Sequence, residues 1–175
     1  DPTLLLSADD YRALIAKHQH NRKTGGGIYT YILDKTRGKN DLVQRLSNEI
    51  NLPIFTYQAN TSLANWTGGS IEQYIMPPVT EWLSGFDCAD FVVTDSFHGM
   101  VFAIIFGKPF IAISNPARGA ARFDSLLSQI GLSDRLVLNS QAELTSSIRE
   151  PLPSAYLSSI SAIQRKSLLA LEMQL

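Results

Sequence analysis

The sequence predicts an α/β fold: a Rossmann-like parallel sheet with helices on both faces. Strand-like segments rich in β-branched and aromatic residues alternate with segments whose apolar residues recur at helical spacing. Two strand segments, FVV at 91–93 and FIAI at 110–113, are wholly apolar, as expected for strands buried on both faces of a parallel sheet. No internal repeat or low-complexity linker divides the chain, so we expect residues 1–175 to form a single Rossmann-like domain.

The first half of the chain predicts three helices and two strands. Ser7 is a suitable N-cap for the first helix, and the prolines at 77–78 suit the first turn of the third. The expected helices cover residues 7–19, 39–51 and 77–89, and the expected strands cover 25–34 and 52–58, followed by a polar loop over 59–70.

The second half continues the alternation with an almost wholly apolar helix. Gly107 closes that helix, Gly131 is a C-cap candidate for the next, and Ser140 with Glu143 has the spacing of a capping box. The expected strands cover 90–95, 108–114 and 135–139, and the expected helices cover 96–107, 117–131, 140–149 and the stretch from Ser154 to the end.

The composition argues against several classes of protein. A formal net charge of −1 gives no overall attraction to nucleic acid, and no apolar run is long enough to span a bilayer. Cys88 is the single cysteine, so an internal disulfide is impossible and Cys/His zinc spacing is absent. We expect a cytoplasmic protein without a metal site. Because the chain begins at Asp1 without Met, we also expect it to be part of a longer protein.

The stretch "TDSFHG" at 94–99 is the first candidate site, because ligands of open α/β sheets bind outside the carboxyl ends of the strands. Asp95 or Ser96 can cap the following helix, and Gly99 permits close approach of a ligand or a neighbouring backbone. Free N–H groups of the first turn favour an anion. His98 is then a candidate catalytic residue; the alternative is a capped helix whose histidine bonds a neighbouring loop.

Basic residues follow two other predicted strands. Arg118 and Arg122 are one helical turn apart and could hold a phosphate or carboxylate between them, or they could be separate surface residues. In the first such loop, Lys35, Arg37 and Lys39 could form a phosphate-binding rim, or a solvated run of charge. The loop has neither Walker spacing nor a dinucleotide fingerprint.

The segment "EWLSGFDCADFVVTDSFHGMVFAIIFGKPFIAI" resembles the central signature of the polysaccharide pyruvyl transferase family. The following "RFDSLLSQIGLSDRLV" is similar to the next segment of that family, and "DPTLLLSADDYRALI" resembles the bridge into its second domain. The resemblance is specific over residues 81–137. It implies the carboxyl-terminal half of a GT-B-like two-domain protein, with the amino-terminal partner domain absent from this chain and substrates bound between the halves.

Members of known activity transfer the pyruvyl group of phosphoenolpyruvate to sugar hydroxyls. The resemblance therefore implies bacterial exopolysaccharide biosynthesis, with phosphoenolpyruvate as donor, a sugar or glycan precursor as acceptor, and no cofactor. By the same analogy His98 is catalytic and Asp95, Ser96 and Gly99 belong to its motif, while Arg118 and Arg122 fall where basic residues would face the cleft.

Two other functions fit the same residues. A GT-B-type glycosyltransferase would bind a nucleotide-sugar diphosphate at the same edge of the sheet. A non-enzymatic interaction module would instead have a buried His98, bonded to protein on both nitrogens, and no open cleft at the strand ends.

Overall fold

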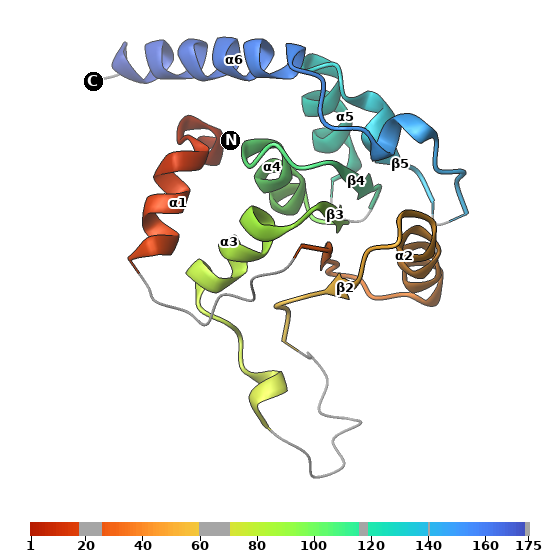
Figure 1. The fold of residues 1–175 in the computed structure, drawn as a ribbon. Helices are drawn as coiled ribbons and strands as arrows, with labels where there is room; N and C mark the ends of the chain where they lie inside the picture. Colours follow the sequence, from red (N-terminus) through yellow and green to blue (C-terminus); the bar gives the residue numbers. More distant parts are fainter. Residues whose placement is uncertain (18–25, 60–70, 116–118, 140, 174–175) are drawn as a thin grey trace.

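The computed structural model describes residues 1–17, 26–59, 71–115, 119–139 and 141–173 (Figure 1). They contain a five-stranded, wholly parallel sheet with the strand order β2-β1-β3-β4-β5. The strands are β1 (Ile28–Tyr31), β2 (Ile54–Phe55), β3 (Phe91–Thr94), β4 (Phe110–Ile113) and β5 (Leu136–Val137). The predicted α/β sheet is therefore confirmed, and each strand lies within its predicted segment.

The helices cover the two faces of the sheet unequally. They are α1 (Ala8–Ala16), α2 (Arg37–Ile50), α3 (Val79–Cys88), α4 (Phe97–Ile105), α5 (Ala120–Gln129) and α6 (Ala155–Glu172), with 3-10 helices η1 (Pro2–Leu5), η3 (Ile71–Tyr74), η5 (Ser133–Arg135) and η6 (Ser146–Arg149). Buried side chains of η1, α1, α3, α4, α5 and α6 form one core, and those of α2 and η6 form the other. Figure 1 shows α2 apart from the group of α1, α3 and α4.

The central strands supply both cores, because alternate residues of a strand face opposite sides of the sheet. In β3, Val92 belongs to the core under α4, whereas Phe91 and Val93 belong to the core under α2. All four residues of β3 and all four of β4 are buried. The prediction that FVV and FIAI form the buried centre of the sheet is therefore confirmed.

Ser7 begins α1 as predicted, through a capping box. Its hydroxyl accepts a hydrogen bond from the backbone N–H of Asp10, whose carboxylate accepts one in return from the N–H of Ser7 at 2.8 Å. The hydrogen bonds that Ser7 donates lower the pKa of Asp10 below its usual range. The sequence therefore identified this helix start correctly.

The prediction of a helix over residues 140–149 is wrong. Residues 142–145 are not helical, only η6 forms after them, and Ser140 lies outside the described residues. The guanidinium of Arg135, which is 2% exposed, donates to the carbonyl of Ile148 at 2.5 Å and to that of Glu150 at 3.2 Å. A buried side chain from η5 thus satisfies two carbonyls at the end of η6 that no helix over 140–149 would bond internally.

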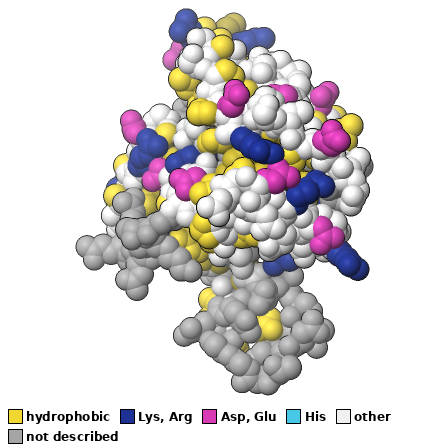
Figure 2. Space-filling model, turned by 45° about the vertical axis from the view of Figure 1, so that its right-hand side comes forward, with side chains coloured by type: hydrophobic (Ala, Val, Ile, Leu, Met, Phe, Trp, Pro, Cys, Tyr) yellow, Lys and Arg dark blue, Asp and Glu magenta, His cyan; other side chains and the backbone are white. Residues whose placement is uncertain are grey.

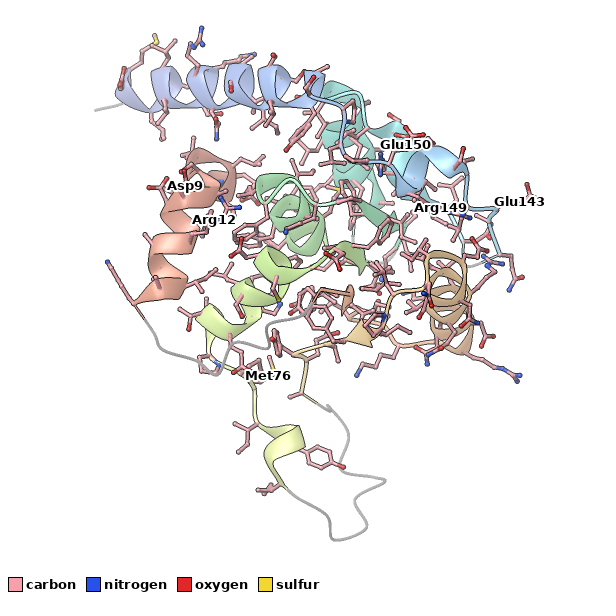
Figure 3. All side chains as sticks on the ribbon, viewed as in Figure 1. Asp9, Arg12, Met76, Glu143, Arg149 and Glu150 are labelled. Carbon is pink, nitrogen blue, oxygen red and sulfur yellow. The ribbon has the colours of Figure 1, made fainter. Side chains whose placement is uncertain are left out.

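Arg135 should therefore contribute more to stability than Arg149 (labelled in Figure 3), which pairs with Glu49 of α2 at the surface. Arg135→Ala leaves two carbonyls without their donors and is expected to lower the free energy of unfolding by about 2–4 kcal/mol. Arg149→Ala should cost less than about 1 kcal/mol. Urea denaturation of both variants tests this, and equal losses would show that Arg135 does not anchor η6.

Candidate functional site

The strand order places a topological switch point between β1 and β3. The connection from β1 leads through α2 to β2 on one side, and the connection from β3 leads through α4 to β4 on the other. Ligands of such sheets bind at the carboxyl ends of the two strands that flank this point. The stretch "TDSFHG" lies there, because β3 ends at Thr94 and α4 begins at Phe97. Its predicted position at a carboxyl strand end is confirmed.

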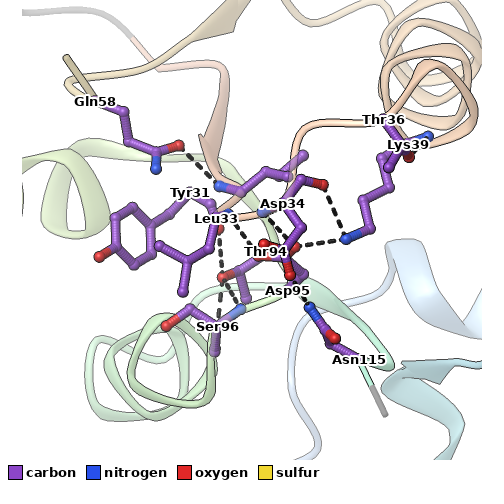
Figure 4. A network of polar contacts seen from close by, with 11 residues as sticks. Tyr31, Leu33, Asp34, Thr36, Lys39, Gln58, Thr94, Asp95, Ser96 and Asn115 are labelled. Carbon is purple, nitrogen blue, oxygen red and sulfur yellow. Dashed lines mark hydrogen bonds and ion pairs between the residues drawn. The ribbon is translucent and has the colours of Figure 1, made fainter. Parts of the chain in front are cut away.

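Asp95 lies at the centre of this edge and is completely buried. Its carboxylate accepts hydrogen bonds from the N–H of Leu33 at 2.7 Å, the N–H of Asp34 at 3.1 Å and the ammonium group of Lys39 at 2.6 Å (Figure 4). Three donors compensate the cost of burying a charge. In this structure Asp95 joins the loop after β3 to the loop after β1, and its expected role in substrate binding stays a prediction.

Lys39 has a different environment from Lys35 and Arg37, the two cations near it in the sequence. Its side chain is 12% exposed, and its ammonium group bonds Asp95 and the carbonyl of Asp34, the latter at 3.0 Å. Lys35 and Arg37 are exposed, and Arg37 lies 3.9 Å from the carboxylate of Asp41. Lys39 is thus part of the framework, whereas Lys35 and Arg37 stay candidates for substrate binding at the surface.

Asp34 and Asn115 extend the framework to a third strand end. The side-chain amide of Asn115, which follows β4 and is buried, donates to the carboxylate of Asp34 (Figure 4). The loops after β1, β3 and β4 are therefore linked by side-chain hydrogen bonds. Neither Asp34 nor Asn115 was predicted as a site residue. A polar residue close behind each strand was the available signal.

Ser96 and Gly99 determine how α4 begins. The hydroxyl of Ser96, a buried residue, accepts a hydrogen bond from the N–H of Gly99 and so caps the helix. A β-carbon on Gly99 would lie 2.3 Å from the hydroxyl oxygen of Thr94, so only glycine lets α4 approach β3 this closely. The close approach at Gly99 is therefore to the protein itself. A role of Ser96 and Gly99 in substrate binding stays a prediction.

His98, in contrast to its neighbours, is accessible to solvent. Its side chain is 54% exposed, and its Nε2 atom lies 3.3 Å from Oδ2 of Asp1. The ring of Phe97 meets the imidazole edge-on, with the two centroids 5.9 Å apart. The buried histidine that an interaction module would require is therefore not observed. The buried residues of this stretch include Asp95, Ser96 and Gly99.

Arg122 contacts the ring of Phe97, the residue that precedes His98. Its guanidinium carbon is 4.9 Å from the centre of the Phe97 ring, a cation–π distance. Asp1, Phe97 and Arg122 line a surface pocket of about 520 Å³, so one concavity contains both a carboxylate and a guanidinium. The structure thus brings Arg122 to the start of α4, while Arg118 lies outside the described residues.

A second pocket, of about 400 Å³, lies after β2 and includes Tyr57, Met76 and Glu81. The ring of Tyr57 packs against Tyr29 and Phe55, and burial raises the pKa of its hydroxyl. Met76 is exposed and lies below α3 in the view of Figure 3. The side chain of Tyr57 therefore packs against residues of β1 and β2.

The surface gives no sign of a single-charge patch on the face shown in Figure 2, where basic and acidic side chains are interspersed. Within the described ranges, no three side chains of His, Cys, Asp or Glu gather in a way that would hold a metal ion. Among these residues there is also no helix both long enough and apolar enough to cross a membrane.

Lys39 and Lys35 offer a matched test of the framework, because both belong to the region after β1 but only Lys39 contacts Asp95. Lys39→Met leaves a buried carboxylate without its counter-charge and should lower the free energy of unfolding by about 3 kcal/mol. Lys35→Met, at an exposed position, should change it by less than about 0.5 kcal/mol. Chemical denaturation measures both, and a neutral Lys39→Met would refute the structural role of the pair.

Comparison with known proteins agrees with the resemblance read from the sequence. The family model for polysaccharide pyruvyl transferase matches residues 1–116 of the 175, from η1 through β4, and includes the whole "TDSFHG" stretch. No curated protein and no solved structure matches the chain. Since the matched range covers more than half of the chain and contains both the switch point and His98, the chain belongs to the polysaccharide pyruvyl transferase family.

Proposed function

We propose that the protein transfers the pyruvyl group of phosphoenolpyruvate to a sugar and forms a pyruvate ketal, with His98 as the general acid. The observation that carries this proposal is the position of His98. It is an exposed imidazole at the switch point of the sheet, inside the range that the family model covers. The transferase family supports the reaction class, and the residues at this edge suit its chemistry.

The reaction needs a proton donor at carbon. His98 gives a proton to the methylene carbon of phosphoenolpyruvate, and the electrons of the double bond form the new C–H bond. An oxocarbenium-like centre results at the adjacent carbon, and a sugar hydroxyl attacks it. The C–O bond to phosphate then breaks, and a second hydroxyl of the same sugar closes the ketal. One hydroxyl proton returns to the imidazole and the other leaves with phosphate.

The donor also needs cations, because it carries a carboxylate and a phosphate. Arg122 is a candidate for this role, because its guanidinium stacks on Phe97, the residue that precedes His98. Arg122 and Phe97 also line the same pocket. Lys35, Arg37 and Arg118 are further candidates for the same role. The first turn of α4 adds backbone N–H groups at the same edge.

We further propose a GT-B-like arrangement in which an amino-terminal domain completes the cleft and supplies the acceptor site. The reacting groups must be held together and water excluded, which a single half does not achieve. Residues 1–175 alone should therefore bind phosphoenolpyruvate weakly and show no turnover. Measurable pyruvyl transfer by this chain alone would contradict the two-domain proposal.

In the full-length protein, His98→Ala should lower the turnover number of pyruvyl transfer by about a hundredfold to ten-thousandfold, the usual contribution of a general acid. The dissociation constant of phosphoenolpyruvate should change much less, because the imidazole acts in the chemical step. Steady-state kinetics with an acceptor sugar, calorimetric binding of the donor and a thermal melt make the comparison. A variant that melts normally and keeps its full rate would exclude His98 from the mechanism.

Arg122→Ala should have the opposite signature and weaken phosphoenolpyruvate binding about tenfold, the loss of one charge-assisted contact. Arg165→Ala is the matched control, because Arg165 is an exposed arginine on α6. Titration of both variants with phosphoenolpyruvate and with a nucleotide sugar tests the assignment. Tight nucleotide-sugar binding without phosphoenolpyruvate binding would favour the glycosyltransferase instead.

A further inference from the structure

We infer that Asp1 is a positioning residue for His98. Its carboxylate fixes the orientation of the imidazole and keeps a proton on Nε2, so that Nδ1 is the nitrogen presented to the substrate. This inference rests on the proposed role of His98 as the general acid. It assigns a partner to that histidine from a part of the chain 97 positions away, which the sequence analysis did not connect with the site.

The carboxylate of Asp1 is oriented by the backbone and not by His98 alone. One oxygen, Oδ1, accepts a hydrogen bond from the N–H of Thr3 at 2.9 Å and caps η1. The other, Oδ2, lies 3.3 Å from Nε2 of His98. The Asp1 side chain is only 18% exposed. Since the capping bond holds the first oxygen, the second is directed at the imidazole before any substrate binds.

Three contacts hold η1, the short helix that Asp1 caps. Leu4 is 4% exposed and belongs to the same core as α4. The hydroxyl of Tyr11 in α1 donates to the carbonyl of Thr3 at 3.0 Å. The side-chain amide of Gln164 in α6 donates to the carbonyl of Leu4 at 2.6 Å. Side chains from α1 and α6 thus hold η1 in place, and with it the contact between Asp1 and His98.

The chemistry of the pair decides which nitrogen can act. Oδ2 lies at ion-pair distance from Nε2, and a negative carboxylate that only accepts hydrogen bonds favours a hydrogen on the nitrogen nearest to it. The tautomer of a histidine is set by the partner of one ring nitrogen, which leaves the other for the reaction. In the acid form of His98, the proton to be delivered is then the one on Nδ1. Phe97 meets the imidazole edge-on and adds a second restraint on the ring.

The competing explanation is that Asp1 serves only to cap η1, and two substitutions separate the possibilities. Asp1→Ser keeps a good N-cap, but its side chain is too short to reach His98. Asp1→Asn keeps the cap and the length and removes the charge. In the full-length protein, Asp1→Ser should lower the turnover number by about tenfold to a hundredfold, the effect of one charge-assisted contact, with the KM for phosphoenolpyruvate nearly unchanged. Asp1→Asn should lower the turnover number at least as far as Asp1→Ser, because the capping bond holds the amide oxygen and the NH2 group then faces Nε2 and favours the wrong tautomer.

A readout independent of activity keeps this inference distinct from the proposed function. The ¹⁵N chemical shifts of the His98 ring, assigned by their loss in His98→Ala, report which nitrogen holds the proton. Under alkaline conditions the wild-type protein should show the Nε2–H tautomer, and Asp1→Ser should show a mixture. An unchanged tautomer in Asp1→Ser would overturn the inference, whether or not His98 is catalytic.

The kinetic outcomes are equally separable. A tautomer change in Asp1→Ser with an unchanged turnover number, in a protein that His98→Ala inactivates, would also overturn the positioning role. If His98→Ala keeps full activity, the proposed function fails, and the ring shifts alone decide whether Asp1 orients the imidazole. A thermal melt of each variant shows whether η1 stays folded, and a normal melt for Asp1→Ser is the expected result.

Discussion

The functional edge of the sheet depends on one buried carboxylate, that of Asp95. A fully buried charge is tolerated only where donors surround it, and here two backbone N–H groups and Lys39 do so. Those donors come from the loop after β1 and the start of α2, so the bonds fix that loop against the end of β3. Asn115 continues the connection to the loop after β4 by bonding Asp34. The geometry of three strand ends thus follows from the need to satisfy Asp95.

This constraint divides the "TDSFHG" stretch into two kinds of residue. Asp95, Ser96 and Gly99 are buried and place the start of α4 against β3, while His98 projects half-exposed from the first turn of that helix. The buried residues hold the backbone, so the imidazole is presented from a fixed position. Such preorganisation is what a proton donor to carbon requires, because the acid must lie in reach of one atom of the substrate.

Local patterns were enough to predict the fold. The apolar runs at β3 and β4 gave the buried centre, and Ser7 gave a correct helix start. The contacts that could not be predicted from the sequence join residues far apart along the chain: Lys39 with Asp95, and Asp1 with His98. The hydrogen bonds from the buried Arg135 to the carbonyls of Ile148 and Glu150 also join separate elements. Spacing reports neighbours along the chain, whereas these pairs depend on the tertiary fold.

In the reaction that we propose, an exchangeable proton is delivered to the methylene carbon of phosphoenolpyruvate during transfer to a sugar. The most direct measurement is the isotopic composition of the product formed by the full-length protein in deuterium oxide. The expected product is a pyruvate ketal whose methyl group carries one deuterium, formed together with one equivalent of phosphate. A ketal with an unlabelled methyl group would contradict the proposed reaction, as would a glycosylated product formed from a nucleotide sugar without consumption of phosphoenolpyruvate.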